Sequence, residues 1–329
     1  MTNQDGQEYV DCSVIIVTYN SARYIDGLLA SLPAAAAGLT LRTIVVDNGS
    51  ADDTVARVRI HPGVICVETG ANLGYSGGIN VGRMQAGECG SVAILNPDLT
   101  MEPGSLREMF SALDDPAVGV VVPMLLDFDG RLDLSLRREP TLLSELGDAL
   151  FGHNHFRRRP AIMSDLVQDK RQYEHRHVVD WATGAVMLVS ADCDRKIGAW
   201  DESFFLYMEE VDYAARVRDA GFLVLYAPQA RVRHLGGGSS QSTKLIALGA
   251  VSRVRYFEKR GDKARMFRAA VCLNQLLRSV KPARRAALRA VARRSTWEPL
   301  ILELKNGAPA RRDVNPKVDS VLSTESDLE

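Results

Sequence analysis

Acidic and amide side chains follow two apolar segments in the first third of the chain. Asp47 ends one β-branched segment, and Asn96-Pro97-Asp98 ends a later one. Carboxylates at such positions can hydrogen-bond a nucleotide or bind a hard divalent cation through oxygen. Asp and Asn also end strands simply because they favour turns. Each position alone is therefore weak evidence, and the combination indicates a binding crevice.

A second acidic group, Glu209, Glu210 and Asp212, stands at the start of a predicted helix. The helix dipole favours acids in a first turn, which is the structural explanation. Three carboxylates within four residues exceed what capping needs. Like charges held together raise one another's pKa, as suits a general base. The segment is therefore a candidate source of a catalytic base.

Glycine and histidine mark two further candidate sites. Residues 74–82 are glycine-rich and are expected to form a loop that enters a helix, where backbone can approach an anion. Their spacing is neither GxGxxG nor GxxxxGK[ST], which disfavours dinucleotide and P-loop sites. His234 precedes a glycine run at 236–238 that could act as a hinge. Two HxH pairs, at 153/155 and 175/177, leave zinc as a minor alternative.

These side chains need a scaffold that brings strand ends together. Short apolar segments alternate with helical patterns, which predicts βαβ units and a mostly parallel sheet. Ligands of such sheets bind outside the carboxyl ends of the strands. The predicted strands are 13–18, 41–46, 63–67, 92–95, 118–122, 178–189 and 222–226, and the predicted helices include 22–32 (stopped by Pro33), 103–113, 191–197, 208–220, 243–260 and 263–294. Periodicity weakens over 127–178, which we expect to be a long irregular excursion.

Composition sets the class of protein. The 329 residues are 46% hydrophobic and 25% charged with a net charge of −1, as in a globular α/β protein, and this balance disfavours nucleic acid as a partner. The five cysteines are scattered without CxxC, which suggests reduced thiols. The polar first residues do not resemble a signal peptide, and no apolar run reaches 18 residues. We therefore expect a cytoplasmic protein.

Taken together, these segments resemble glycosyltransferase family 2, the inverting nucleotide-sugar transferases of GT-A fold. The resemblance covers about residues 11–260 and is greatest to bacterial rhamnosyltransferases of cell-wall and polysaccharide assembly. It implies a mostly parallel twisted sheet flanked by helices, with a C-terminal helical extension. The matching segments are 13–20, 45–50, 72–80, 95–98, 181–185, 205–212 and His234.

The resemblance also implies roles for individual residues. Asp98 takes the metal-binding place of the family's Asp-x-Asp motif, with His234 completing the metal site or touching the diphosphate. Asn96 stands where that motif has its first Asp, which removes one charge. Trp181 and Gly184 shape the acceptor site. Glu210 holds the position of the base, usually Asp in the family, with Glu209 and Asp212 beside it as catalytic candidates. The implied donor-binding residues are Thr18, Tyr19, Asn20, Asp47, Asn72, Gly77, Gly78, Asn80 and Asn96.

The implied activity is a metal-assisted single displacement with Mg²⁺ or Mn²⁺. It moves a sugar, rhamnose from dTDP-rhamnose as first choice, to a hydroxyl of a glycan or polyprenyl-diphosphate-linked saccharide. A nucleotidyltransferase is the first alternative, but it would want a glycine-rich loop after the first strand, where Thr18-Tyr19-Asn20 stands. A non-catalytic sugar-nucleotide-binding protein is the second, but it would be expected to lose Asp98 or Glu210.

The C-terminal part carries the charge asymmetry of the chain. Residues 263–294 contain ten Lys or Arg and no Asp or Glu, with apolar residues at helical spacing. Such a helix can lie on an anionic membrane surface, here the inner face of the cytoplasmic membrane, or pack on the catalytic domain. We predict a catalytic domain at 1–260 (donor half 1–125, acceptor half 126–260), a basic extension at 261–297 and a polar tail at 298–329. No oligomeric state is predicted.

Overall fold

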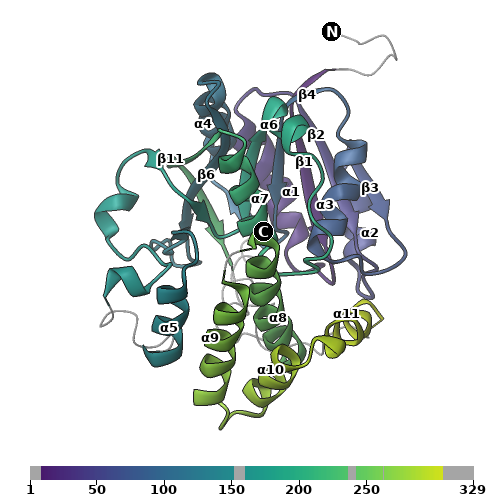
Figure 1. The fold of residues 1–329 in the computed structure, drawn as a ribbon. Coiled ribbons are helices and arrows are strands. Elements are labelled where there is room, and N and C mark those ends of the chain that lie inside the picture. Colours follow the sequence, from purple (N-terminus) through teal and green to yellow (C-terminus); the bar gives the residue numbers. More distant parts are fainter. Residues whose placement is uncertain (1–8, 152–159, 236–241, 262, 307–329) are drawn as a thin grey trace.

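A mixed central sheet organises the molecule (Figure 1). The computed structural model describes residues 9–151, 160–235, 242–261 and 263–306. The sheet has nine strands, ordered β3-β2-β1-β4-β10-β6-β11-β5, with β8 paired to β11, and β7 pairs with β9 apart from it. The strands are β1 Val10–Thr18, β2 Leu41–Asp47, β3 Val64–Glu68, β4 Cys89–Leu95, β5 Leu99–Met101, β6 Val118–Leu126, β7 Leu136–Arg137, β8 His177–Val178, β9 Trp181–Ala182, β10 Val186–Ser190 and β11 Leu223–His234.

Helices cover both faces of this sheet and continue at its lower edge in Figure 1. They are α1 Ile25–Ala36, α2 Thr54–Arg59, α3 Gly74–Gln85, α4 Ser105–Ser111, α5 Leu142–Phe151, α6 Ala191–Ile197, α7 Glu209–Asp219, α8 Thr243–Arg260, α9 Ala264–Leu277, α10 Pro282–Ala292 and α11 Trp297–Lys305. Short 3₁₀ turns occur at η1 Ala112–Asp114, η3 Ala161–Met163, η4 Lys170–Tyr173 and η5 Arg294–Thr296. The predicted α/β class is confirmed.

The first four strands form the parallel half that the sequence predicts. Register pairs Thr18 of β1 with Asp47 of β2, and Asp47 with Glu68 of β3, so the strands end together. Along β1, Ile15 belongs to one hydrophobic core and Ile16 to another. Because both faces of the strand are buried, its side chains form one β-branched run rather than alternating with polar residues. The polar residues after these strands therefore share one edge.

The strand predicted to end at residue 226 continues to His234, so that prediction was wrong. β11 passes through Pro228 with a register shift between Ala227 and Arg231. Such an irregularity tolerates a proline that cannot donate to the ladder. The extended strand pairs antiparallel with β5, where His234 stands opposite Leu99. This pairing places His234 beside the residue that precedes Leu99, Asp98.

The glycine-rich segment, predicted as a loop that enters a helix, is helical from Gly74 onward, so the loop part of that prediction was wrong. A Cβ at Gly78 would lie 2.5 Å from a Val17 methyl, and one at Gly82 would lie 2.4 Å from an Ile15 methyl. Several of the glycines therefore serve close packing of α3 on β1. The helix predicted to stop at Pro33 likewise runs to Ala36, since the alanines after the proline favour helix and two of them are buried.

Two predictions about the later chain need correction. The described part of 127–178 is ordered and contains β7, α5, η3, η4 and β8. The single helix predicted for 263–294 is two helices, because the chain turns before Pro282, which takes the first position of α10. His153, His155 and the glycine run 236–238 lie outside the described residues.

The C-terminal helices form a layer below the carboxyl ends of the parallel strands (Figure 1). Val254 of α8, Val271 of α9, Val291 of α10 and Trp297 of α11 share one hydrophobic core. The boundary predicted at residue 260 falls between α8 and α9, inside this layer. None of the described helices is long and apolar enough to cross a bilayer.

Candidate active site

The loops after β1 and β2 are hydrogen-bonded into one rigid unit. Asp47 is 2% exposed and accepts hydrogen bonds from Thr18 Oγ1 (2.9 Å), Ser50 Oγ (2.5 Å) and the Ser50 amide (2.8 Å). Asn20 has a left-handed backbone (φ 54°), and its side chain accepts from the Ala51 amide at 2.8 Å. These bonds fix the loops at the carboxyl edge of the sheet, where Tyr19 is half-buried.

The start of α3 forms the neighbouring wall. Asn72 Oδ1 accepts from the Gly74 amide at 2.9 Å. Asn48 Nδ2 donates to the Gly74 carbonyl at 2.8 Å, while its buried Oδ1 has no protein partner in the described part of the chain. Asn48 was not among the predicted site residues, although it follows Asp47 directly. An orphaned buried oxygen leaves an acceptor for a ligand donor.

Two predicted donor-binding residues of α3 are used within the protein. Asn80 Nδ2 donates to the Trp200 carbonyl and to Glu202, and its Oδ1 accepts from the Trp200 amide, each at 2.9 Å. A Cβ at Gly77 would lie 2.8 Å from Leu73 Cβ. Asn80 therefore ties α3 to the 200–202 segment, and its amide group is occupied.

The catalytic candidates Glu209 and Glu210 begin α7 after two left-handed residues. Tyr207 and Met208 have φ of 70° and 71°, a conformation that side chains rarely adopt and that marks local strain. Glu209 is 6% exposed, and the Oε2 atoms of both glutamates are buried without a partner among the described residues. Burial raises the pKa of both, and the charge of Glu210 raises the pKa of Glu209 further.

The predicted acceptor residue Gly184 lies directly against Glu210. A Cβ there would come within 3.0 Å of Glu210 Cβ, so a larger residue would displace the carboxylate. Backbone groups, including that of Gly184, and the charge of Arg137 partly oppose the raised pKa of Glu210. Trp181 is buried, donates its indole N–H to the Arg138 carbonyl at 2.8 Å, and has the Arg137 guanidinium 5.9 Å from its ring. Its strand, β9, packs against α7, the helix that carries Glu210.

Asp212, the third acid of the segment, differs from its neighbours. Its carboxylate accepts from Lys259 at 2.6 Å and from Arg216 at 2.9 Å, and it is 2% exposed. It therefore joins α7 to α8 as an ion-paired structural group. Of the three predicted catalytic acids, Glu209 and Glu210 have no ion-pair partner among the described residues, whereas Asp212 has two.

The metal candidates Asp98 and His234 meet at the end of β11. Asp98 Oδ1 lies 3.4 Å from His234 Nε2, and both side chains are partly exposed. Burial alone would lower the pKa of His234, but its hydrogen bond to Asp98 and the charges of Asp98 and Asp133 raise it. Asn96 is also partly exposed, and its backbone N–H donates to the Ala185 carbonyl at 2.9 Å.

These two ligands fit a metal held jointly with a substrate. No group of three or more His, Cys, Asp or Glu that could hold a metal occurs among the described residues. One carboxylate oxygen and one imidazole nitrogen suit a divalent ion whose remaining ligands are diphosphate oxygens and water. The zinc alternative gains no support, since His177 Nδ1 contacts the His175 carbonyl at 3.0 Å.

Sequence reasoning missed Tyr75, whose hydroxyl lies close enough to Glu209, Glu210 and Asp98 to be affected by their charges. Its hydroxyl is buried without a partner in the described part of the protein. Burial, followed by the charges of Glu209, Glu210 and Asp98, raises its pKa well above the ordinary value. Its position after Asn72-Leu73-Gly74 was the available signal. Tyr75 therefore lies among the groups expected to hold the donor and the base.

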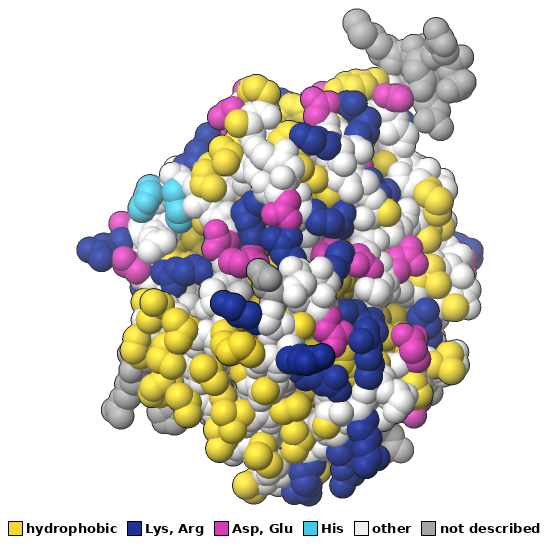
Figure 2. All heavy atoms as spheres, viewed as in Figure 1, with side chains coloured by type: hydrophobic (Ala, Val, Ile, Leu, Met, Phe, Trp, Pro, Cys, Tyr) yellow, Lys and Arg dark blue, Asp and Glu magenta, His cyan; other side chains and the backbone are white. Residues whose placement is uncertain are grey.

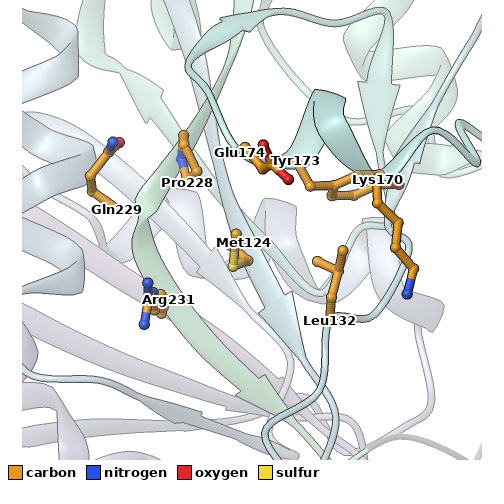
Figure 3. Close-up of a pocket in the computed structure, with 8 residues that line it drawn as sticks. All are labelled: Met124, Leu132, Lys170, Tyr173, Glu174, Pro228, Gln229 and Arg231. Atoms are coloured by element: carbon orange, nitrogen blue, oxygen red, sulfur yellow. The ribbon is translucent and has the colours of Figure 1, made fainter.

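A separate cavity of about 440 Å³ lies between β6, β11 and η4 (Figure 3). Met124, Tyr173, Pro228 and Arg231 are among its lining residues. None of the predicted site residues lines it, and we therefore do not assign it to the candidate active site.

Two solved structures share this architecture. GalNAc-T7 with UDP, GalNAc and Mn²⁺ aligns with a TM-score of 0.56 at 14% identity, covering 91% of this chain and 58% of that one. Mannosyltransferase PcManGT from Pyrobaculum calidifontis, in complex with GDP-Man and Mn²⁺, aligns with a TM-score of 0.52 at 16% identity, covering 98% and 81%. The fold is therefore the GT-A fold of glycosyltransferases.

The family follows from sequence. The family model "Glycosyl transferase family 2" matches residues 13–178. The N-acetylglucosaminyl-diphospho-decaprenol L-rhamnosyltransferase of Mycobacterium tuberculosis is 33% identical over 67% of this chain and 75% of its own. Rhamnosyltransferase WbbL of Escherichia coli is 23% identical over 70% and 85%. The chain belongs to glycosyltransferase family 2 and is a glycosyltransferase similar to bacterial rhamnosyltransferases.

Proposed function

We propose that this enzyme transfers a sugar with inversion, with Glu210 as the general base. The observation that carries the proposal is the Glu210 carboxylate, which lies beside Gly184 with a raised pKa and with a buried oxygen, Oε2, that has no partner in the described part of the protein. A base needs a free oxygen to receive a proton and a pKa nearer neutrality than that of an ordinary glutamate. Asp212 lacks the first property because two cations hold it.

The reaction is one in-line displacement. The acceptor oxygen forms a bond to the anomeric carbon as the bond from that carbon to the diphosphate oxygen breaks. The acceptor proton passes to the Glu210 carboxylate, and the electron pair leaves with the nucleoside diphosphate. A positioned base of this kind contributes about 10²–10⁴ in rate. Burial and the charge of Glu210 raise the pKa of Glu209, so the two acids do not readily ionise together.

The donor occupies the edge formed by the loops after β1, β2 and β4 in this proposal. Asp47, Thr18 and Asn20 hold the shape of the nucleotide pocket, and Asn48 offers its unpartnered oxygen. Asp98 and His234 would hold Mn²⁺ or Mg²⁺, and their contact at 3.4 Å supports this assignment. When bound, such a metal neutralises charge that develops on the leaving diphosphate.

The relatives suggest the substrates. One acts, by its name, on a decaprenol-diphosphate-linked sugar, and two are rhamnosyltransferases. We therefore propose dTDP-rhamnose as donor and a polyprenyl-diphosphate-linked saccharide as acceptor. Such an acceptor would place the enzyme at the inner face of the cytoplasmic membrane.

The test combines binding with turnover. Thermal shift against a panel of nucleoside diphosphates and sugar nucleotides, with Mg²⁺ or Mn²⁺, identifies the donor, because a ligand that binds only the native state raises Tm. Glu210→Gln should keep the donor-induced shift and lose at least about a hundredfold in turnover. Glu202→Gln, an exposed acid bonded to Asn80, is the matched control and should retain most activity. Full turnover by Glu210→Gln would disprove the assignment of the base.

A further inference from the structure

Helix α5 is inverted relative to an ordinary surface helix. It buries Glu145 and Asp148, and it exposes Leu143 and Leu150, the latter to 62%. The buried acids face Arg253 of α8, which bonds Glu145 and lies 3.7 Å from Asp148. In water, a helix gains no stability by burying its acidic side chains and exposing its leucines. The exposed leucines therefore need an explanation outside the folding of the helix itself.

Helix α9 is apolar on two faces. Phe267 and Val271 pack inward. On the other side the residues recur at helical spacing and stay exposed, and Val280, just past the helix, is 88% exposed. A helix with two apolar faces normally lies between two apolar partners. The exposed residues of that second face are Met266, Leu273, Leu276, Leu277 and Val280.

The two helices join into one surface. α5 packs against α9, and Arg278 at the end of α9 donates to the Asp148 carbonyl. Hydrophobic side chains gather over these helices at the lower left of Figure 2. Contiguous apolar patches of this kind mark an interaction site. We call this surface the leucine face, formed by Leu143, Leu150, Phe151, Ile162, Met266, Leu273, Leu276, Leu277 and Val280.

Cations border the leucine face along α10. Lys281, Arg285, Arg289 and Arg293 are exposed at spacings of four residues, and Lys and Arg gather beside the apolar area in Figure 2. Arg285 also donates to the carbonyls of Ser279 and Val280, at 2.9 and 3.1 Å, and so holds the turn that presents Val280. An apolar face with a basic margin is complementary to an anionic lipid surface.

We propose that the leucine face docks on an anionic bilayer, with Leu276, Leu277 and Val280 inserted at the interface and the α10 cations on lipid headgroups. A second copy of the chain is the less suitable occupant, because a two-fold contact would bring two basic margins together. Leu143 and Ile162 also line a cavity of about 610 Å³ with Arg138 and Asp180, so docking would bring lipid to its rim. The proposal rests on the proposed function in one respect: a lipid-linked acceptor would explain why the enzyme binds a membrane.

The test is flotation of the whole protein with vesicles, without donor or acceptor. Binding is expected to vesicles of equal parts phosphatidylglycerol and phosphatidylcholine in low salt. Leu276→Glu with Leu277→Glu should lower the bound-to-free ratio at least about tenfold, because charge replaces inserted side chains. Lys281→Gln with Arg289→Gln should lower it roughly tenfold or more on the anionic vesicles. The matched control is Ile60→Glu with Met84→Glu, two residues that are each 73% exposed outside the leucine face, and it should bind as wild type does.

Several outcomes would overturn the proposal. They are no wild-type binding at low salt, equal binding to pure phosphatidylcholine, or a dimer in light scattering that Leu276→Glu with Leu277→Glu dissociates while vesicles have no effect. Circular dichroism melts of each variant test whether it folds, so that a folding defect is not mistaken for lost docking. Transfer to a water-soluble acceptor is measured in parallel, so failed docking with intact transfer disproves this proposal alone.

Discussion

The molecule buries two groups of carboxylates and uses them differently. Glu145 and Asp148 of α5, with Asp165, surround Arg253. Glu209 and Glu210 of α7 have no salt bridge within the described residues. Burial raises the pKa of Glu145 as it does that of the α7 pair, although Arg253 opposes it there.

The comparison shows that a raised pKa does not by itself identify a catalytic acid. What separates the groups is the cation: the charges of Glu145, Asp165 and Asp148 raise the pKa of Arg253 against the effect of its burial, so Arg253 stays charged and offsets part of their negative charge. Among the described residues the α7 pair has no such partner, and the Oε2 atom of each glutamate is left for a ligand. The first group maintains the fold, and we assign the second to the reaction.

Removing the cation of the α5 cluster should have the largest effect. Arg253→Met removes the cation that Glu145, Asp148 and Asp165 share, and a broken buried ion pair typically costs about 3–5 kcal/mol of unfolding free energy. Urea unfolding measures the loss. Arg260→Met, which breaks an exposed pair with Asp219, is the control and should cost under about 1 kcal/mol. Equal losses in the two variants would show that Arg253 contributes no more to stability than an exposed ion pair does.

The pH dependence should report the unpaired group. Because the pKa of Glu210 is raised, kcat/KM should fall tenfold per pH unit below that raised value, at a higher pH than an ordinary glutamate would require. Stability should change in the opposite direction. The contribution of the pair is fully present below the unfolded-state pKa, about 4.3, and is lost as pH rises through the folded values. A pH–rate profile with thermal melts tests both signs, and an acid limb near the ordinary glutamate pKa would contradict the assignment.

Asp98 adds to the comparison an acid that contacts a histidine, His234. Asp98→Ala should weaken binding of the nucleotide-sugar at least about tenfold when Mg²⁺ or Mn²⁺ is present, and much less in EDTA, because it removes an oxygen ligand. Calorimetry with and without the metal measures the difference. Asp133→Ala serves as the control, since that acid affects His234 only through its charge. The same loss in EDTA would show that Asp98 contacts the donor without a metal.

The smallest effect is expected at Glu209. Glu209→Gln replaces a buried acid whose ionisation is opposed by burial and by the charge of Glu210, so Tm at neutral pH should rise by a few degrees. Glu145→Gln, made for comparison, removes a charge that Arg253 does offset and should lower Tm. Differential scanning calorimetry of both variants decides, and a fall in both would mean that the two groups are equivalent.

The strands and their ends could be predicted because β1 and its neighbours are buried on both faces, which leaves a plain run of β-branched residues. Helix α5 could not, because its inward face carries Glu145 and Asp148 and so lacks an apolar period. β11 was cut short because a proline within a strand argues against continuation, and only its pairing with β5 shows that the strand continues.

The site residues were likewise predictable from the sequence only in part. Asp98, His234 and Glu210 were identified from motif resemblance, and the structure brings Asp98 and His234 together. That Asp212 is neutralised depends on Lys259, 47 residues later, and no local pattern records this contact. Tyr75 and Asn48 depend on which side of α3 meets β1 and β2, and the tertiary packing of the α3 glycines determines that side.

The contacts between α3 and the 200–207 segment link the two halves of the enzyme mechanically. Asn80 bonds Trp200, and the Tyr75 amide donates to the Phe205 carbonyl at 2.8 Å, next to where a Cβ on Gly74 would collide. Phe205 lies four residues before Glu209. Because these contacts connect α3 to the turn before α7, a shift of α3 would be transmitted to the start of α7, where Glu209 and Glu210 lie.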